Sequence, residues 1–478
     1  MAKEFLHILH TNDLHSHLEE MKYITTGMRR LRNSLQRPNS HVVTADLGDH
    51  MDRMHLQTEA TWGQVNIEVL NEAGYDLAAI GNNEGLTFPR EKLDSLYNRA
   101  NFKVLCANLR DQHTKKLLPG VHPCTIEKYG QITVGWIGVT APFTHFYELM
   151  GLEATDVFQT VSSLVKQMRP HVDIVVLLSH VGYNHDIELA SKVNGIDLIL
   201  GAHTHTYLPV GEWVNGTLIC QTGKFGDYFG HVQIEYDVEK KVINTMQAVC
   251  IPSKQFPEDN RIQEILTYYH RQSETIMQEV VAELNRDVPV SWEEESPLAN
   301  LLAQGLRSWV DAEIALVNSG TLLFSLSKGP VTRKDMLSLC PHPINPCKMK
   351  ITGQQLKTIL EESLEPYITR RQIRGFGFRG KVLGRMSLDG LDVYYHPNRP
   401  TGEKIDKIII GEQSIDERAI YTVATIDMFT FGIVFPTFTQ GIDVEFYLPE
   451  FLRDVLEVEL TKQRSLKKCT SQRWHPVI

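Results

Sequence analysis

Short apolar runs that alternate with amphipathic stretches fill the first half of this 478-residue chain, and they constrain its fold most. Each run has the length of a buried strand, and the stretches between them are long enough for helices. The runs are Phe5 to Leu9, Val42 to Ala45, Leu77 to Ile80, Val104 to Ala107, Ile132 to Val139, Ile174 to Leu178 and Ile196 to Leu200. Strands that alternate with helices build layered α/β domains, so we predict that architecture here.

Five of these predicted strands run directly into side chains that can bind a metal ion. In chain order the residues are Asp13 and His15, then Asp49, Asn82, His180, and finally His203 and His205. In layered α/β folds the loops at the carboxyl ends of the strands lie together, because a rigid sheet positions them. We therefore expect the five loops to converge on one site.

The side-chain types at these strand ends indicate the class of metal. Imidazoles, carboxylates and one amide, without a thiolate, favour zinc, manganese or iron over a structural zinc site made of cysteines. Gly48, Gly81 and Gly201 let the backbone turn sharply beside the ions. One carboxylate can bridge two ions, and Asp49 is the best candidate. Two such ions can activate water and offset the charge of a phosphoryl group.

The ordered set of motifs resembles that of the calcineurin-like metallophosphoesterases, and more narrowly that of the 5′-nucleotidase family. The motifs are Asp13-Leu14-His15, Gly48-Asp49, Gly81-Asn82-Asn83-Glu84, Ser179-His180 and Gly201-Ala202-His203-Thr204-His205. The resemblance implies an α/β fold with an N-terminal four-layer αββα sandwich, a linker helix and a C-terminal α+β substrate domain. It also implies two divalent ions, Mn²⁺ or Zn²⁺. One would be held by Asp13, His15, Asp49 and His205, and the other by Asp49, Asn82, His180 and His203.

One motif departs from the family. Asn83 and Leu86 stand where the family has a catalytic His and its Asp partner. An amide can donate a hydrogen bond but cannot protonate a leaving group. We name Asn83 as a candidate catalytic residue, together with His50, which follows Asp49 and could supply the missing acid. His50 could equally be a hydrogen-bonded structural residue.

The apolar period changes after the first half. From Glu258 to Leu284 apolar residues recur at three- and four-residue spacings, which predicts one long amphipathic helix. Ser296 and Pro297 then predict a new helix, with an N-cap followed by proline at the first position. The predicted parts are a metallophosphoesterase domain at 1–253, the linker helix at 254–286 and a 5′-nucleotidase C-terminal-like domain at 287–478.

The last part also resembles the family's substrate domain, which implies recognition of a nucleotide. Val317 to Gly320 is similar to the family's Asn-containing segment, although the arginine of that segment is absent, and the aromatic clamp is matched only loosely. The candidates for substrate binding are Asn318, Arg374, Phe376, Phe378, Arg379, Phe429 and Phe431. The rings could stack on a base or pack a core, and the arginines could bind phosphate or lie in a solvated loop.

Charge and composition restrict the partners and the compartment. The formal net charge is −10, so a nucleic-acid polymer or an anionic membrane has no basic surface to bind. The longest aliphatic run is far shorter than the roughly 20 residues of a membrane helix, and no secretion signal is visible. The seven cysteines form no Cys-x-x-Cys pair, which fits reduced thiols. We expect a soluble, cytoplasmic protein whose partner is a small phosphorylated metabolite, with a nucleotide first.

Three functions follow from these patterns. The first is a two-metal, nucleotidase-like phosphomonoesterase. The second is a nucleotide-sugar diphosphatase or a cyclic-nucleotide phosphodiesterase. The third belongs to another class: a metal- and nucleotide-binding sensor in which loss of the catalytic His has weakened turnover. The complete set of metal motifs argues against the sensor.

Overall fold

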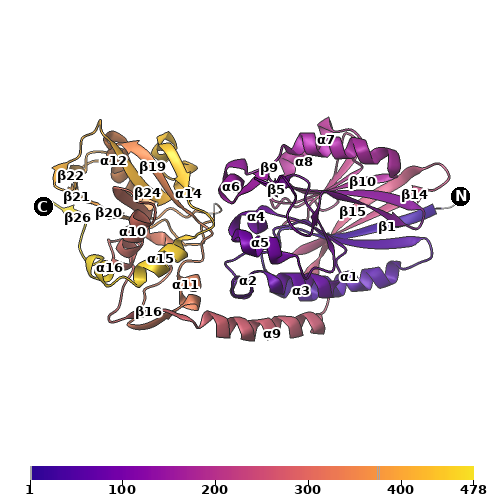
Figure 1. Cartoon of the computed structure of the whole chain (residues 1–478), viewed down its shortest axis with the longest axis horizontal. Helices are drawn as coiled ribbons and strands as arrows, with labels where there is room; N and C mark the ends of the chain where they lie inside the picture. Colours follow the sequence, from indigo (N-terminus) through magenta and orange to yellow (C-terminus); the bar gives the residue numbers. More distant parts are fainter. Residues whose placement is uncertain (1–2, 374, 376, 478) are drawn as a thin grey trace. The chain divides into compact units, whose positions relative to one another are not determined.

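The chain forms two compact units, each with its own hydrophobic core (Figure 1). The structure, a computed structural model, describes residues 3–373, 375 and 377–477. Contacts between Cα atoms divide the chain into Met1–Ser273 and Glu274–Ile478. The division falls within helix α9 (Asn260–Met277), which therefore contributes to both units.

Two mixed β-sheets form the centre of the first unit. Their orders are β15-β14-β1-β2-β3-β4-β6 and β12-β13-β11-β10-β8-β7. The first sheet contains β1 (Lys3–Thr11), β2 (Ser40–Asp46), β3 (Leu77–Ala79), β4 (Lys103–Leu105), β6 (Val121–His122), β14 (Tyr228–Asp237) and β15 (Val242–Pro252). The second contains β7 (Cys124–Tyr129), β8 (Ile132–Thr140), β10 (Ile174–His180), β11 (Leu198–Gly201), β12 (Glu212–Val214) and β13 (Thr217–Cys220). A two-stranded sheet pairs β5 (Leu109–Asp111) with β9 (Leu152–Ala154).

The two large sheets face each other and carry helices on their outer faces. Leu6 and Ile8 of β1 share one buried cluster with Val176 and Leu178 of β10, because alternate residues of each strand point inward. Outside lie α1 (Met21–Leu35) and α3 (Gln64–Ala73) on one side, and α7 (Val157–Met168) and α8 (Tyr183–Lys192) on the other (Figure 1). The predicted four-layer αββα sandwich is confirmed.

Short helices occupy the loops at the carboxyl ends of the strands. They are α2 (Leu56–Thr61), α4 (Asn82–Thr87), α5 (Arg90–Leu96) and α6 (Thr144–Leu149). Helix α4 begins at a predicted metal ligand, three residues after β3 ends. The sheet thus fixes the first turn of this helix.

The predicted long helix from Glu258 to Leu284 is wrong in its last part. Helix α9 ends at Met277, and Val280–Leu284 forms strand β16, which pairs antiparallel with β18 (Gly329–Thr332). Valines at 280 and 281 favour an extended chain over a helix. Apolar residues at 276, 280 and 284 fit a four-residue and a two-residue period equally, so the spacing alone could not locate the end of the helix.

The second unit is an α+β domain with two main sheets. Their orders are β20-β17-β24-β19-β25 and β23-β22-β21-β26. The first contains β17 (Ile314–Asn318), β19 (Pro346–Thr352), β20 (Met386–Asp389), β24 (Ile420–Ile426) and β25 (Ile442–Phe446). The second contains β21 (Leu391–Tyr395), β22 (Ile405–Ile410), β23 (Gln413–Ser414) and β26 (Trp474–Pro476). The helices are α10 (Pro297–Trp309), α11 (Arg333–Leu339), α12 (Gly353–Ser363), α13 (Pro366–Thr369), α14 (Asp427–Thr430), α15 (Leu452–Leu460) and α16 (Gln463–Lys468). Helix α10 begins at Pro297 with Ser296 as its N-cap, as predicted.

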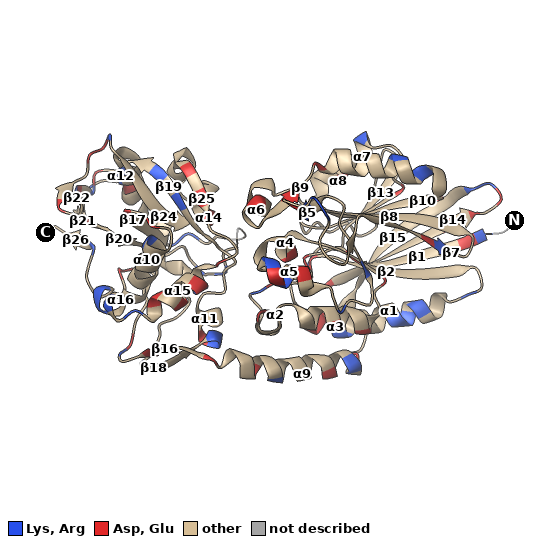
Figure 2. Cartoon of the chain, viewed as in Figure 1, with Lys and Arg blue, Asp and Glu red and all other residues tan. Residues whose placement is uncertain are grey.

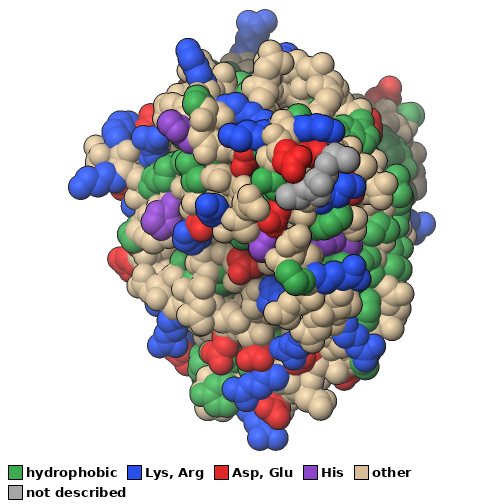
Figure 3. Space-filling model, turned by 90° about the vertical axis from the view of Figure 1, so that its right-hand side faces the viewer, with side chains coloured by type: hydrophobic (Ala, Val, Ile, Leu, Met, Phe, Trp, Pro, Cys, Tyr) green, Lys and Arg blue, Asp and Glu red, His purple; other side chains and the backbone are tan. Residues whose placement is uncertain are grey.

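Charged side chains of both signs are interspersed over the elements of each unit (Figure 2). On the face drawn in Figure 3, basic side chains are scattered among acidic and hydrophobic ones. Within the described residues, no helix combines the length and the apolar character that crossing a membrane requires.

Candidate metal centre

The seven predicted ligands lie together at the ends of their strands. Strands β1 and β2 pair in parallel, as do β10 and β11, so within each sheet the loops that follow them leave from the same edge. The ligand atoms form two groups, in each of which they lie within 4.8 Å of one another: Asp13, His15 and His205, and Asp49, His180 and His203. Asn82 joins the second group, since its Oδ1 lies 2.7 Å from His203 Nδ1. The strand-end pattern predicts this convergence.

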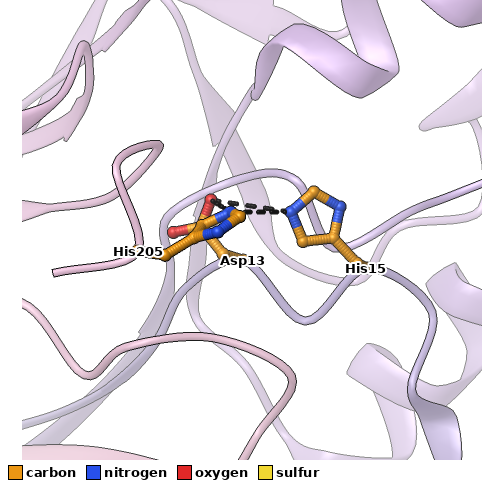
Figure 4. A group of neighbouring side chains, drawn as sticks. All are labelled: Asp13, His15 and His205. Atoms are coloured by element: carbon orange, nitrogen blue, oxygen red, sulfur yellow. Dashed lines mark hydrogen bonds and ion pairs between the residues drawn. The ribbon is translucent and has the colours of Figure 1, made fainter. Parts of the chain in front are cut away.

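The first group consists of one carboxylate and two imidazoles that point toward one another (Figure 4). His15 Nε2 lies 3.0 Å from His205 Nε2. Asp13 Oδ1 lies 3.4 Å from His205 Nε2 and 3.9 Å from His15 Nε2. Three donor atoms of these kinds, converging from separate loops, can hold a borderline divalent cation.

The Asp49 carboxylate lies between the two groups. Its Oδ2 is 3.8 Å from His15 Nε2, in the first group, and its Oδ1 is 3.3 Å from His180 Nε2, in the second. The two oxygens of one side chain therefore face different groups. This is the placement that a carboxylate shared by two ions requires.

The second group contains a buried nitrogen that a cation would satisfy. His180 Nδ1 lies 2.7 Å from the Leu47 carbonyl oxygen, which can only accept, so Nδ1 carries the proton. His180 Nε2 is then the ring nitrogen that faces the site: it is buried, lies 3.3 Å from Asp49 Oδ1, and among the described residues makes no hydrogen bond of good geometry. A buried polar atom without a partner is costly, and a bound divalent ion would remove that cost. The donor set and this open nitrogen together fit a pair of divalent ions.

The backbone is strained at most of these side chains. Positive φ angles occur at five of the seven: Asp13 (49°), His15 (47°), Asp49 (49°), His203 (74°) and His205 (57°). A non-glycine residue in this region costs about 1–3 kcal/mol, so the surrounding structure must enforce it, as is common at ligand sites. Hydrogen bonds between the loops do so: Asp13 N donates to Gly48 O at 3.1 Å, and His15 N donates to Asp49 O at 2.8 Å.

The site favours the protonation states that metal binding needs at four of its residues. Burial opposes ionisation of Asp49, but His180 and His15 hold its pKa well below the usual range. Burial likewise opposes ionisation of Asp13, and His205 and His180 lower its pKa. Burial lowers the pKa values of His15 and His203, which keeps these imidazoles neutral. Burial would also lower the pKa of His180, but Asp49 raises it to about 10, so a cation must displace a proton there.

Two glycines allow the loops to touch. A Cβ on Gly48, whose φ is +87°, would lie 2.4 Å from Gly81 N. A Cβ on Gly81 would lie 2.1 Å from Asp49 Oδ1. Glycine is needed at 81 because two ligand loops meet backbone to backbone.

Three buried polar residues behind the ligands were missed from the sequence. Asn12 donates from Nδ2 to Asp13 Oδ2 at 2.8 Å. Asp186 of α8 accepts from Ser179 Oγ at 2.5 Å and from Gln221 Nε2 at 2.9 Å. Glu84 accepts from three backbone amides of the ligand loops. Asn12 and Glu84 stand beside ligands in the sequence, but only the fold reveals their partners.

The two candidate catalytic residues lie differently from the sequence-based expectation. The Asn83 amide nitrogen is 3.0 Å from His15 Nδ1 and donates to Met51 O at 3.1 Å, so the side chain is positioned behind a predicted ligand. The His50 ring is 2% exposed and its Nδ1 lies 3.2 Å from Asn66 Nδ2. Burial lowers the pKa of His50 to about 3, so the ring is a neutral imidazole and not an imidazolium at neutral pH, which argues against a role as the acid.

Three of the predicted substrate-binding residues are internal. Phe429 is fully buried and stacks on Phe438, with 5.2 Å between centroids. Phe378 is 3% exposed and stacks on His342 at 5.3 Å. Of the two alternatives for these rings, stacking on a base or packing a core, their burial fits the core. Buried Asn318 donates from Nδ2 to the Leu383 carbonyl at 2.7 Å, so this donor is occupied.

The other four substrate candidates divide into two exposed and two undescribed residues. Phe431 is 48% exposed. Arg379 is also exposed, with its backbone N donating to His342 Nδ1 at 2.8 Å. Arg374 and Phe376 lie outside the described residues.

Comparisons with known proteins agree with this site and fold. Residues 6–207 match the calcineurin-like phosphoesterase family, and residues 275–440 match the 5′-nucleotidase C-terminal domain. The chain is 36% identical to the uncharacterized metallophosphoesterase YunD of Bacillus subtilis (strain 168), over 96% of this chain and 100% of that one. It is 23% identical to the 5′-nucleotidase of Bos taurus, over 84% of this chain and 77% of that one.

A solved structure shows the same fold. The NAD nucleotidase of Haemophilus influenzae superposes with a TM-score of 0.71 at 16% identity, and the match covers 100% of both chains. The chain therefore belongs to the calcineurin-like metallophosphoesterases that carry a C-terminal 5′-nucleotidase domain, and it is a metal-dependent phosphoester hydrolase.

Proposed function

We propose that this hydrolase is a nucleotidase-like phosphomonoesterase that uses two Mn²⁺ or Zn²⁺ ions. The observation that carries the proposal is the Asp49 carboxylate, whose two oxygens face separate groups of donor atoms. Asp13, His15 and His205 would complete the first ion site. Asn82, His180 and His203 would complete the second.

The proposed ligands differ in their exposure to solvent. When bound, the ions would activate a water molecule and offset phosphoryl charge. The His180 and Asp13 side chains are 0% exposed, whereas the His205 side chain is 31% exposed. A phosphate ester would therefore approach from the His205 side, with buried carboxylates beneath it. Strained but hydrogen-bonded loops keep the donor atoms aimed before the ester arrives.

A nucleotide is the substrate class that the relatives favour. Their names include a 5′-nucleotidase and an NAD nucleotidase, and the second unit matches the 5′-nucleotidase C-terminal domain. With Phe378 and Phe429 buried, Phe431 is the predicted aromatic residue that the structure describes as exposed, at 48%. Base recognition in this chain would rest on Phe431, supported by the cationic Arg379.

The test compares ester classes on metal-loaded protein. Mn²⁺-loaded enzyme should hydrolyse p-nitrophenyl phosphate faster than bis(p-nitrophenyl) phosphate, and nucleoside 5′-monophosphates with lower KM than sugar phosphates. Metal analysis should give two equivalents per chain. Hydrolysis of the diester alone, or equal kcat/KM for sugar phosphates and nucleotides, would contradict the proposal.

A further inference from the structure

The buried carboxylate of Glu84 joins two metal-ligand loops. Glu84 lies in the first turn of α4, is 1% exposed, and makes three hydrogen bonds to backbone amides. Its Oε2 accepts from Asp49 N at 3.0 Å and from Gly81 N at 2.9 Å. Its Oε1 accepts from Met51 N at 3.0 Å. One side chain thus holds the loop after β2 and the loop after β3 together.

The residues that Glu84 holds are those whose positions matter most. Asp49 is the carboxylate shared by the two donor groups, and its φ of 49° is strained. Gly81 directly precedes Asn82, the amide ligand of the second group. Met51 O accepts from the Asn83 side chain, which also lies against His15. Of the three backbone amides that donate to Glu84, one therefore belongs to a predicted ligand, one directly precedes a predicted ligand, and the third belongs to a residue whose carbonyl holds Asn83 against His15.

We propose that Glu84 is a positioning residue that fixes Asp49 and Asn82 relative to each other and so sets the affinity for the metal pair. Because Oε2 is shared by Asp49 N and Gly81 N, a shift of either loop stretches one of these bonds. The inference rests on the proposed ligand assignment, although Glu84 itself is in neither of the two groups of donor atoms found among the described residues.

Replacing Glu84 by Gln exchanges one of the two acceptor oxygens for an NH₂ group and leaves the shape of the side chain nearly unchanged. The glutamine keeps one oxygen, and its NH₂ must face at least one of the three backbone N–H groups. That amide then meets a donor in place of an acceptor, in a buried site where an unpaired polar group is costly. Glu84→Ala removes all three acceptors. Loss of groups that orient metal ligands typically weakens metal binding about 10–100-fold.

Glu361 provides a matched control in the second unit. It is 6% exposed, and its two oxygens accept from backbone N of Lys404 at 3.0 Å and Ile405 at 2.7 Å. It belongs to α12, far in sequence from every predicted ligand. Glu361→Gln therefore disturbs the same kind of bond without touching the ligand loops.

The experiment measures backbone protection and metal affinity separately. In the metal-free protein, hydrogen exchange of segments 46–52 and 79–84 should be faster in Glu84→Gln than in wild type. Calorimetric titration with Mn²⁺ should show affinity reduced about tenfold in Glu84→Gln and about 100-fold in Glu84→Ala. In Glu361→Gln, faster exchange should be confined to the region around 404–405, with Mn²⁺ affinity unchanged.

The outcomes separate this inference from the proposed function. Wild-type Mn²⁺ affinity in Glu84→Gln and Glu84→Ala would overturn the positioning role, and so would equal losses of affinity in Glu84→Gln and Glu361→Gln. If Glu84→Ala does not fold, the isosteric Glu84→Gln decides alone. Wild-type protein that binds no Mn²⁺ or Zn²⁺ would instead refute the ligand assignment itself.

Discussion

Substitution of Gly81 by alanine tests whether contact between the ligand loops controls the site. The φ of Gly81 is in the ordinary range, so alanine is acceptable to the backbone at this position. The obstacle is crowding. The new Cβ would lie 2.1 Å from Asp49 Oδ1, 2.2 Å from Asp49 N and 2.7 Å from Glu84 Oε2.

The size of the effect follows from these distances. Real Cβ contacts are essentially never shorter than 3.0 Å, so the contact to Asp49 Oδ1 must lengthen by at least the difference from 2.1 Å, which is about 0.9 Å. The loops must then separate, or the shared carboxylate must rotate. Displacement of catalytic groups by about 1 Å can cost on the order of 10²-fold in rate. We expect kcat/KM for p-nitrophenyl phosphate to fall about 100-fold, with a loss of about 1–3 kcal/mol in stability from overpacking.

The matched control is Gly353→Ala in the second unit. A Cβ on Gly353 would lie 2.2 Å from Asp416 O, which is the same degree of crowding away from any predicted ligand. Both variants should unfold at lower urea concentration than wild type, but Gly81→Ala alone should lose activity and Mn²⁺ affinity. Full activity in a destabilised Gly81→Ala, or equal loss of activity in both variants, would refute the argument.

Three further changes test other parts of the molecule. Asp49→Ala should abolish hydrolysis of every ester and remove at least one equivalent of bound metal. In wild type, by contrast, activity lost on EDTA treatment should return when Mn²⁺ is added. Two retained ions and a normal kcat in Asp49→Ala would contradict the role of Asp49 as a ligand shared by both ions. Phe431→Ala should raise KM for nucleoside 5′-monophosphates about tenfold, within the roughly 1–3 kcal/mol of base stacking, and leave p-nitrophenyl phosphate unaffected. For His342, burial lowers the pKa to about 4. Between pH 6.5 and pH 4, His342 therefore binds a proton in the unfolded chain but not in the folded chain. The free energy of unfolding is highest above pH 6.5 and falls as the pH is lowered, by about 3 kcal/mol at pH 4. Urea titrations should show a shallower pH dependence for His342→Gln.

Strand positions could be predicted from sequence because burial on both faces leaves a continuous apolar run. Ile174 to Leu178 is such a run, and it forms most of β10. The sequence was ambiguous about the end of α9, because the residues after Met277 continue the helical spacing whereas their β-branched side chains favour a strand. These residues form a strand because they pair with β18, whose residues lie about 50 positions later in the chain. Pairing over that distance leaves no mark on local periodicity.

Ligand residues were visible in the sequence, whereas the contacts that aim them were not. The residue type of a His or Asp, together with its position at the end of a predicted strand, is enough to predict a metal ligand. The partner of Asn83 depends on where loop 49–52 runs, and the structure places His15 and Met51 O against its amide. Phe429 and Phe431 are two residues apart and of the same type, yet one is buried and the other is 48% exposed. Phe429 lies within the short helix α14 and Phe431 caps its end, and this local geometry leaves only the second of the two rings accessible to a substrate.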